Sequence, residues 1–233
     1  MTISLIHVNP KTGLSASITA TGGVAVGGYV NHSWRNLGGC ATQGLFTNPW
    51  YADLARKCLT EGMSAAETVE ALKAGDDEFS KRQCLVMDRN GNSAFIHGND
   101  NVPVTGSIAF PTLAVAGNML ESDSVLAALA DSFLEQVAIN AESVRAGGVP
   151  KYRHDYEDQL PETLISALEK SLQAGGDKRG TFSASLRVES MTKAPVDIRV
   201  DWADGDLIEA LRKVLRHVRG AEFQEFLNNL PNQ

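Results

Sequence analysis

The chain has 233 residues, of which 43% are hydrophobic and 21% are charged. These fractions are typical of a folded globular protein, and the length favours a single domain over residues 1–233. The apolar runs are far shorter than the 18 or more residues of a membrane span. The formal net charge is −7, with no long run of Lys or Arg, which argues against a phosphate-tracking surface. We therefore expect neither a membrane nor a nucleic acid as a partner.

The N-terminus has no basic leader and no signal-length apolar core, so it carries no export signal. The three cysteines show no C-x-x-C spacing, which favours a reducing cytoplasm over a disulfide framework. The five histidines never fall within one helical turn of each other, so no metal signature is present. We expect a cytoplasmic protein without a metal or other cofactor.

The first 21 residues are predicted to contain a β-hairpin. Thr2–Val8 is rich in β-branched and apolar residues, and the segment from Asn9 to Gly13 supplies Pro and Gly for the turn. The return strand alternates strictly, with Leu14, Ala16, Ile18 and Ala20 on one face and Ser15, Ser17, Thr19 and Thr21 on the other. The small hydroxyl residues are expected to face solvent or a polar cleft.

The middle of the chain is predicted to contain short strands, then two helices, then a second hairpin. The helices are marked by Pro49 at a first-turn position and by the capping-box pattern from Ser64 to Glu67. The hairpin turn is marked by Asn90-Gly91. The elements lie at residues 22–39 (short strands), 48–60 and 64–73 (helices), 82–87 and 93–97 (strands).

The rest of the chain is predicted to contain further strands and helices. They are predicted at residues 107–115 (strand), 122–138 (helix), 141–159 (loop), 162–173 (helix), 182–189 and 196–201 (strands) and 207–218 (helix). Strands in groups and helices in pairs, without regular βαβ alternation, favour an α+β protein over a doubly wound one.

Common catalytic motifs are absent: there is no G-x-S-x-G, no G-x-x-x-x-G-K-[ST] and no H-E-x-x-H. The sharpest chemical feature is Thr2, because a methionine before a small residue is normally trimmed. A free α-amine has a pKa of about 7.7–8.0, so part of it is neutral at cellular pH. One residue then supplies both nucleophile and general base. Catalysis from Cys40 or Cys84 is a weaker alternative, because both are expected to be buried thiols of the core.

Several short motifs together resemble the family called domain of unknown function 1028. They are Met1-Thr2-x-Ser4, Gly39-Cys40-Ala41-Thr42-Gln43, Thr47-Asn48-Pro49-x-Tyr51, Arg82-Gln83, Gly117-Asn118-Met119-Leu120, Gly175-Gly176-Asp177-x-Arg179-Gly180, Ser183-Ala184 and Ile198-Arg199-Val200-Asp201. This family resembles the N-terminal nucleophile hydrolases. The resemblance implies an α+β fold of the four-layer αββα sandwich type and a Thr2 nucleophile.

The same resemblance suggests further site residues. Arg35 falls about where related hydrolases carry a cation, and a positive charge beside the Thr2 amine would lower its pKa. Substrate contact is expected from residues of the shared motifs: Thr42, Gln43, Asn48, Asn118, Asp177, Arg179 and Ser183. Two alternatives stay open at this point. The amides and hydroxyls could instead satisfy backbone groups at strand ends, and Asp177 and Arg179 could form a local ion pair instead of a carboxylate clamp.

The leading functional hypothesis is hydrolysis of an amide bond in a small metabolite or a peptide by Thr2. The alternative is a scaffold like the N-terminal nucleophile hydrolases that binds a ligand or oligomerises without catalysis. The alternating charges of the segment Asp197–Asp201 are typical of an interfacial or solvated sheet edge, so we also expect a homo-oligomer, most simply a homodimer.

Overall fold

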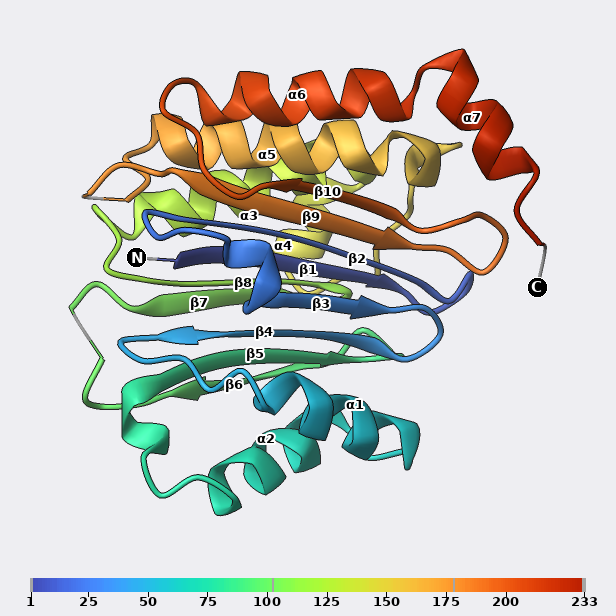
Figure 1. The fold of residues 1–233 in the computed structure, drawn as a ribbon. Helices are drawn as coiled ribbons and strands as arrows, with labels where there is room; N and C mark the ends of the chain where they lie inside the picture. The colour runs from blue at the N-terminus through green and yellow to red at the C-terminus, as the bar shows by residue number, and fades with distance from the viewer. Residues whose placement is uncertain (1, 102, 178, 232–233) are drawn as a thin grey trace.

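The computed structural model describes residues 2–101, 103–177 and 179–231. Within these ranges the chain forms two antiparallel sheets and seven α-helices, an α+β architecture as predicted. The two sheets lie between two groups of helices (Figure 1). No helix in these ranges has the length and apolar character needed to cross a membrane.

The larger sheet has six strands in the order β10-β9-β2-β1-β8-β7. The predicted N-terminal hairpin forms its centre, with Thr2 opposite Thr21 and Asn9 opposite Leu14. Gly13, with φ 72°, takes the left-handed conformation that the turn requires. The strand bounds are β1 (Thr2–Asn9), β2 (Leu14–Thr21), β7 (Gly106–Phe110), β8 (Leu113–Asn118), β9 (Ser183–Glu189) and β10 (Val196–Val200).

The smaller sheet has four strands in the order β3-β4-β5-β6, namely β3 (Asn31–Trp34), β4 (Gly38–Gly44), β5 (Arg82–Asp88) and β6 (Ser93–His97). The predicted turn between the last two is present. The Asp88 carboxylate accepts the backbone N–H groups of Asn90 and Asn92, and Gly91 has φ 78°. An acidic side chain that bonds its own turn in this way fixes the register of the hairpin.

Helices cover the outer face of each sheet (Figure 1). The smaller sheet packs against α1 (Tyr51–Thr60) and α2 (Ala65–Ala74), and α2 begins with the predicted capping box of Ser64 and Glu67. The larger sheet packs against α3 (Ser124–Val137), α5 (Leu160–Gln173) and α6 (Leu207–Val218). Two short helices, α4 (Ala141–Arg145) and α7 (Ala221–Asn228), follow α3 and α6.

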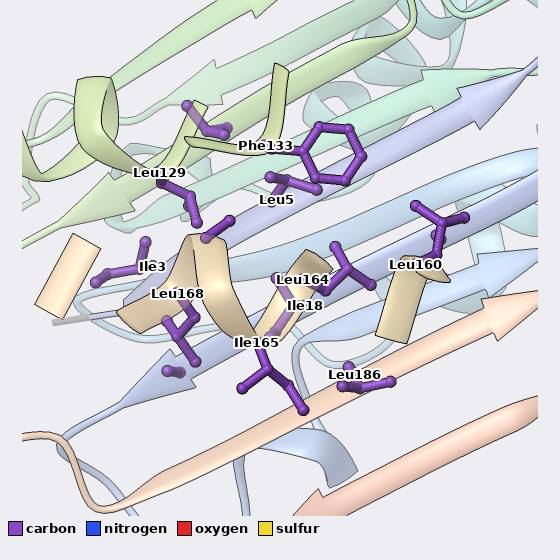
Figure 2. Packing of buried hydrophobic residues seen from close by; sticks show 14 of the residues in the cluster. Ile3, Leu5, Ile18, Leu129, Phe133, Leu160, Leu164, Ile165, Leu168 and Leu186 are labelled. Carbon is purple, nitrogen blue, oxygen red and sulfur yellow. The ribbon is translucent and has the colours of Figure 1, made fainter. Parts of the chain in front are cut away.

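Three apolar clusters fill the spaces between these elements. The largest joins β1, β2, β8 and β9 to α3, α5 and α6, and Figure 2 shows Leu5 and Ile18 beneath Phe133 and Leu164. A second cluster joins the smaller sheet to α1 and α2. The third lies between the sheets, where Ile6 and Ala116 of the larger sheet belong to the same cluster as Leu85 of the smaller one.

The structure differs from the predicted elements at three places. The strand expected at 107–115 is a hairpin, β7 and β8, because Pro111 and Thr112 (φ 70°) form a turn inside the apolar run. The loop expected at 141–159 contains α4 and a 3-10 turn at Tyr156–Gln159. Helix α7 follows Gly220, where the sequence analysis placed no element.

Candidate functional site

Thr2 lies at the end of the central strand of the larger sheet. It is flanked by Thr21 of β2 on one side and by Asn118 of β8 on the other. Its hydroxyl donates to the hydroxyl of Thr21 at 3.2 Å. Thr2 is partly exposed, whereas both flanking residues are buried. The strand therefore delivers a hydroxyl to the boundary between a packed interior and solvent.

Asp177 contacts the segments that follow both neighbours of Thr2, Thr21 of β2 and Asn118 of β8. Its carboxylate accepts the backbone N–H of Gly22 at 2.8 Å, one residue beyond Thr21. Its backbone forms a bridge with Leu120, two residues beyond Asn118. A side chain at Gly22 would meet the carboxylate at 2.6 Å, so glycine is what allows this close approach. The loop after α5 thus brings a buried acid to the end of the sheet where β1 begins.

The Asp177 carboxylate is held in its ionised form. Burial by itself favours the neutral acid, but hydrogen bonds from Arg179 and from Gly22 outweigh it and lower the pKa of the carboxyl. Arg179 donates from its backbone at 2.8 Å and from its guanidinium at 3.1 and 3.2 Å. The local ion pair of Asp177 and Arg179 is present, and contact of Arg179 with a substrate carboxylate stays a prediction.

A buried polar network lies behind Thr2, between the two sheets. The Ser4 hydroxyl bonds to Gln43 at 2.6 Å, and Gln43 bonds to Gln83 at 2.7 Å. Gln83 accepts from the Asn118 amide at 3.0 Å and donates to the backbone oxygen of Gly117 at 2.9 Å. Because every member is buried, each of these bonds replaces a bond to water that folding removes.

This network changes the interpretation of two predicted substrate-binding residues. The Gln43 amide donates to Gln83 and to the backbone oxygen of Thr2, at 2.7 and 3.4 Å. It therefore orients β1 and is already bonded, as the alternative interpretation had it. Asn118 also donates to Gln83, but its side-chain oxygen is buried without a hydrogen-bond partner. Asn118 thus combines an anchoring bond with an unused acceptor next to Thr2.

The other predicted substrate-binding residues lie at different places. Ser183 pairs with Thr21 across β9 and β2, and its hydroxyl donates to the Gly23 backbone at 2.7 Å. Thr42 bonds to Thr47 and to the backbone oxygen of Asn48, at 3.1 and 3.0 Å. The Asn48 amide donates to Asp76 at 2.9 Å. Thr42 and Asn48 thus fix the connection from β4 to α1, and the bonds they form do not lead to Thr2.

The prediction that Arg35 lies beside Thr2 is wrong. Arg35 follows β3, and the next residue, Asn36, donates its backbone N–H to Gly13 at 2.7 Å. Gly13 belongs to the turn that joins β1 to β2, at the opposite end of the hairpin from Thr2. Strand β3 runs away from the Thr2 end of the sandwich (Figure 1). The sequence distance between Thr2 and Arg35 gave no information on this direction.

Cys40 and Cys84 are buried, with their sulfur atoms 3.6 Å apart. Both belong to the cluster between the smaller sheet and its helices. A hydrogen bond with Cys40, together with burial, raises the pKa of the Cys84 thiol. This environment is that of inert core thiols. In the part of the chain that the structure describes, no three His, Cys, Asp or Glu side chains gather to hold a metal ion.

The site also contains residues that the sequence analysis did not select: Ser4, Thr19, Thr21 and Gln83. Two signals pointed to them. Ser4, Thr19 and Thr21 lie on the hydroxyl-bearing face of the hairpin, and Gln83 lies in one of the shared motifs. Thr19 bonds to Ser4 at 2.9 Å and so closes the network on the β2 side.

Comparison with known proteins identifies similar folds. The crystal structure of protein SPO2555 from Silicibacter pomeroyi, assigned to the family model DUF1028, superposes with a TM-score of 0.83. The two chains are 26% identical, and the match covers 99% of this chain and 92% of the other. The family model itself, described as a family of unknown function, matches residues 2–211.

The chain belongs to the DUF1028 family. The resemblance inferred from the short motifs is therefore confirmed, and the match of the DUF1028 model begins at Thr2. The Anbu (ancestral beta-subunit) protein from Yersinia bercovieri is a more distant neighbour of this DUF1028 chain, 10% identical with a TM-score of 0.38 over 100% of this chain and 99% of the other. No curated protein matches the chain.

Proposed function

We propose that this DUF1028 chain is an amide hydrolase of the N-terminal nucleophile type, with Thr2 as its nucleophile. The observation that carries the proposal is the placement of Thr2 at the end of the central strand, between Thr21 and Asn118 and with Asp177 bonded across both flanks. The two sheets between helical layers support assignment to the αββα sandwich of these hydrolases.

The proposed mechanism uses a mature chain that begins at Thr2. The neutral α-amine takes the proton of the Thr2 hydroxyl as its oxygen attacks the carbonyl carbon of the amide. The resulting ammonium returns that proton to the leaving amine, which leaves an ester on Thr2. Water then hydrolyses the ester, with the same α-amine as base. An ionised carboxylate at Asp177 stabilises the ammonium formed in both steps.

The substrate class follows from the site only in part. We propose an amide bond of a small metabolite or a short peptide, since Thr2 reaches solvent at a strand end. The unused acceptor on Asn118 suits an N–H group of that substrate. We further propose that the enzyme works in the cytoplasm as a homodimer, because β10 leaves one edge of the larger sheet unpaired.

An N-terminal threonine probe tests the chemistry directly. A β-lactone acylates such a hydroxyl, and intact mass and peptide mapping locate the adduct. We expect the protein from its native cells to begin at Thr2 and to be labelled there. Thr2→Ala should stay folded and unlabelled, Thr2→Ser should be labelled, and Thr12→Ala in the hairpin turn should match the wild type.

Two results would contradict the proposal. One is a fully active preparation that retains Met1, because an acylated α-nitrogen cannot act as base and the loss of a general base costs about 10²–10⁴-fold in rate. The other is labelling at Cys40 instead of Thr2. For the assembly, sedimentation that shows only a 25.0 kDa species at micromolar concentrations would contradict the homodimer.

A further inference from the structure

A second polar site lies along the open edge of the sandwich, away from Thr2. It is a groove of about 680 Å³, bounded by β3 of the smaller sheet, by β9 and β10 of the larger sheet and by α1. Strand β3 is the last strand of its sheet and β10 is the last strand of the other, so the sheets leave this side open. The volume is within the usual range for small-molecule sites, about 300–1,000 Å³.

The groove gathers positive charge in a protein whose net charge is −7. Its charged lining residues are Arg35, Arg56, Arg187, Arg199, Glu189 and Asp197. Both acids bond to Arg187, which reaches Glu189 at 2.9 Å and Asp197 at 2.6 Å. Among the described residues, no carboxylate forms an ion pair with Arg56 or Arg199. Two guanidinium groups of the lining, those of Arg56 and Arg199, therefore have no ion-pair partner in the described part of the groove.

Two buried acceptor atoms in the same lining lack a hydrogen-bond partner. They are the side-chain oxygen of Asn31 and the Nε2 nitrogen of His32. The Asn31 amide nitrogen is occupied, since it donates to Ser17 at 3.2 Å and to the Ser185 backbone at 3.4 Å. His32 uses its other ring nitrogen on the Tyr29 backbone. A buried acceptor without a donor destabilises the free protein, and an O–H or N–H group of a ligand that reaches these atoms removes this cost.

Gly27 allows Arg199 to take its position. A side chain at Gly27 would meet Nε of Arg199 and the Ser185 side chain at 2.6 Å each. The Arg199 guanidinium therefore lies close to the 3-10 turn Val26–Gly28, in the space that a side chain at residue 27 would occupy. A guanidinium at this position offers the paired donors that match a carboxylate or a phosphate.

We propose that this groove binds a small organic oxyanion, a phosphate or a carboxylate, that also carries hydroxyl or amine hydrogens. Arg199 and Arg56 bind the anionic group, and Asn31 and His32 accept from the hydroxyl or amine groups. The site is separate from Thr2, and its existence does not depend on the proposed hydrolase activity.

Titration with two probes tests the proposal and separates the two anion types. The probes are sn-glycerol 3-phosphate and L-malate, and the readouts are calorimetry and the ¹⁵N shift of His32 Nε2. We expect at least one probe to bind with a dissociation constant below about 1 mM and to shift the His32 signal. Arg199→Gln should weaken binding by about tenfold or more, since a hydrogen bond to a charged group is lost. Arg56→Gln is a second variant with the same expectation.

A matched control is Arg216→Gln, which removes an exposed arginine that is paired with Glu209 on α6. It should bind both probes as the wild type does. Failure of both probes to bind with a dissociation constant below about 1 mM would overturn the proposal, and so would equal affinity in Arg199→Gln. A wild-type dimer that binds neither probe and dissociates in Arg199→Gln would assign the groove to a second copy of the chain instead. None of these results depends on labelling of Thr2.

Discussion

The two faces of the N-terminal hairpin are both buried, but they are held by different forces. The face toward the helices is apolar, and Leu5 and Ile18 pack there against Phe133 and Leu164 (Figure 2). The face toward the smaller sheet carries Ser and Thr side chains beside Ile6 and Val8, and these hydroxyls are joined by hydrogen bonds to one another and to Gln43 of β4. Burial on the first face stabilises by removing apolar area from water, and on the second only because each polar group finds a partner.

This difference explains where a reactive residue can be placed. The apolar side chains of the first face offer no group that can orient a hydroxyl or bind a charge. The polar face does both, since Gln43 donates to the Thr2 backbone and Thr21 accepts from its hydroxyl. The hairpin thus anchors itself on one face and presents chemistry on the other.

The largest expected effect is on the apolar face. Leu5→Ala should lower the free energy of unfolding by about 3 kcal/mol, because Leu5 is fully buried and its removal leaves a cavity. Urea denaturation measures the change. Leu45→Ala is the control, since Leu45 is partly exposed on a loop and should change stability by less than about 0.5 kcal/mol. Similar losses from both variants would show that the apolar face does not dominate stability.

A pH effect of nearly the same size is expected from His7, which belongs to the helix-facing side of β1. Burial lowers its pKa to about 4, against a hydrogen bond with Thr112 that raises it. The unfolded chain, with a pKa near the usual 6.5, therefore takes up a proton first as the pH falls. The stability contributed by neutral His7 is complete above about pH 6.5, and about 3 kcal/mol of it is lost by pH 4.

Urea denaturation of the wild type and of His7→Gln at several pH values between 7 and 4 isolates this contribution. The variant should lose less stability on acidification than the wild type does. His154→Gln, at an exposed position, should keep the wild-type slope. If His7→Gln and the wild type share one pH profile, His7 is not protonated on unfolding.

On the polar face the largest loss of stability should come from substitution of Gln83, which bonds to the most members of the buried network. Gln83→Met keeps the size of the side chain but leaves the amides of Gln43 and Asn118 without their acceptor. We expect a loss of about 2 kcal/mol in the free energy of unfolding. Labelling of Thr2 should also weaken, because Gln43 orients the Thr2 backbone.

The matching control is Gln136→Met on the exposed face of α3, where no comparable loss should occur. An unchanged stability in Gln83→Met would mean that the polar face tolerates unpaired groups. The contrast between the two faces would then be wrong.

The smallest effect is expected further along the polar face, at Ser17. Its hydroxyl accepts from Asn31 at 3.2 Å and from Ser33 at 2.9 Å. Ser17→Ala should cost about 1 kcal/mol, the usual net value of a neutral hydrogen bond. Thermal unfolding measures it against Ser143→Ala, an exposed serine on α4. A loss as large as that of Leu5→Ala would remove the proposed ranking of the two faces.

The hairpin shows how far the sequence could predict this fold. Strict alternation identified both faces of β2, but it could not tell whether the hydroxyl face meets solvent or another sheet. That depends on partners such as Gln43, which come from distant parts of the chain. The strand expected at 107–115 failed for a different reason. Pro111 lies inside the run and cannot donate to a ladder, and this signal was outweighed by the apolar residues around it.

The shared motifs selected Thr2, Asn118 and Asp177, but the sequence could not predict which of the selected residues lie next to Thr2. Thr2 follows from the chemistry of an N-terminal threonine and from the shared motifs. Its neighbour Asn118 is set by the antiparallel pairing of β1 with β8, and Asp177 by a bridge to Leu120. Arg35 failed because a cation two strands later in the sequence can lie at either end of the sandwich, and only the direction of β3 decides which.

The central position of β1 also determines when each of its two edges can be paired during synthesis of the chain. One partner of β1 is the adjacent β2, but the other is β8, about a hundred positions later. Translation adds about 5–20 residues per second, so roughly ten seconds pass between the synthesis of Thr2 and that of Asn118, its pairing partner in β8. During that interval one edge of β1 is unpaired and the start of the chain is open to the enzymes that meet it at the ribosome. Completion of the six-stranded sheet then pairs this edge of β1 with β8.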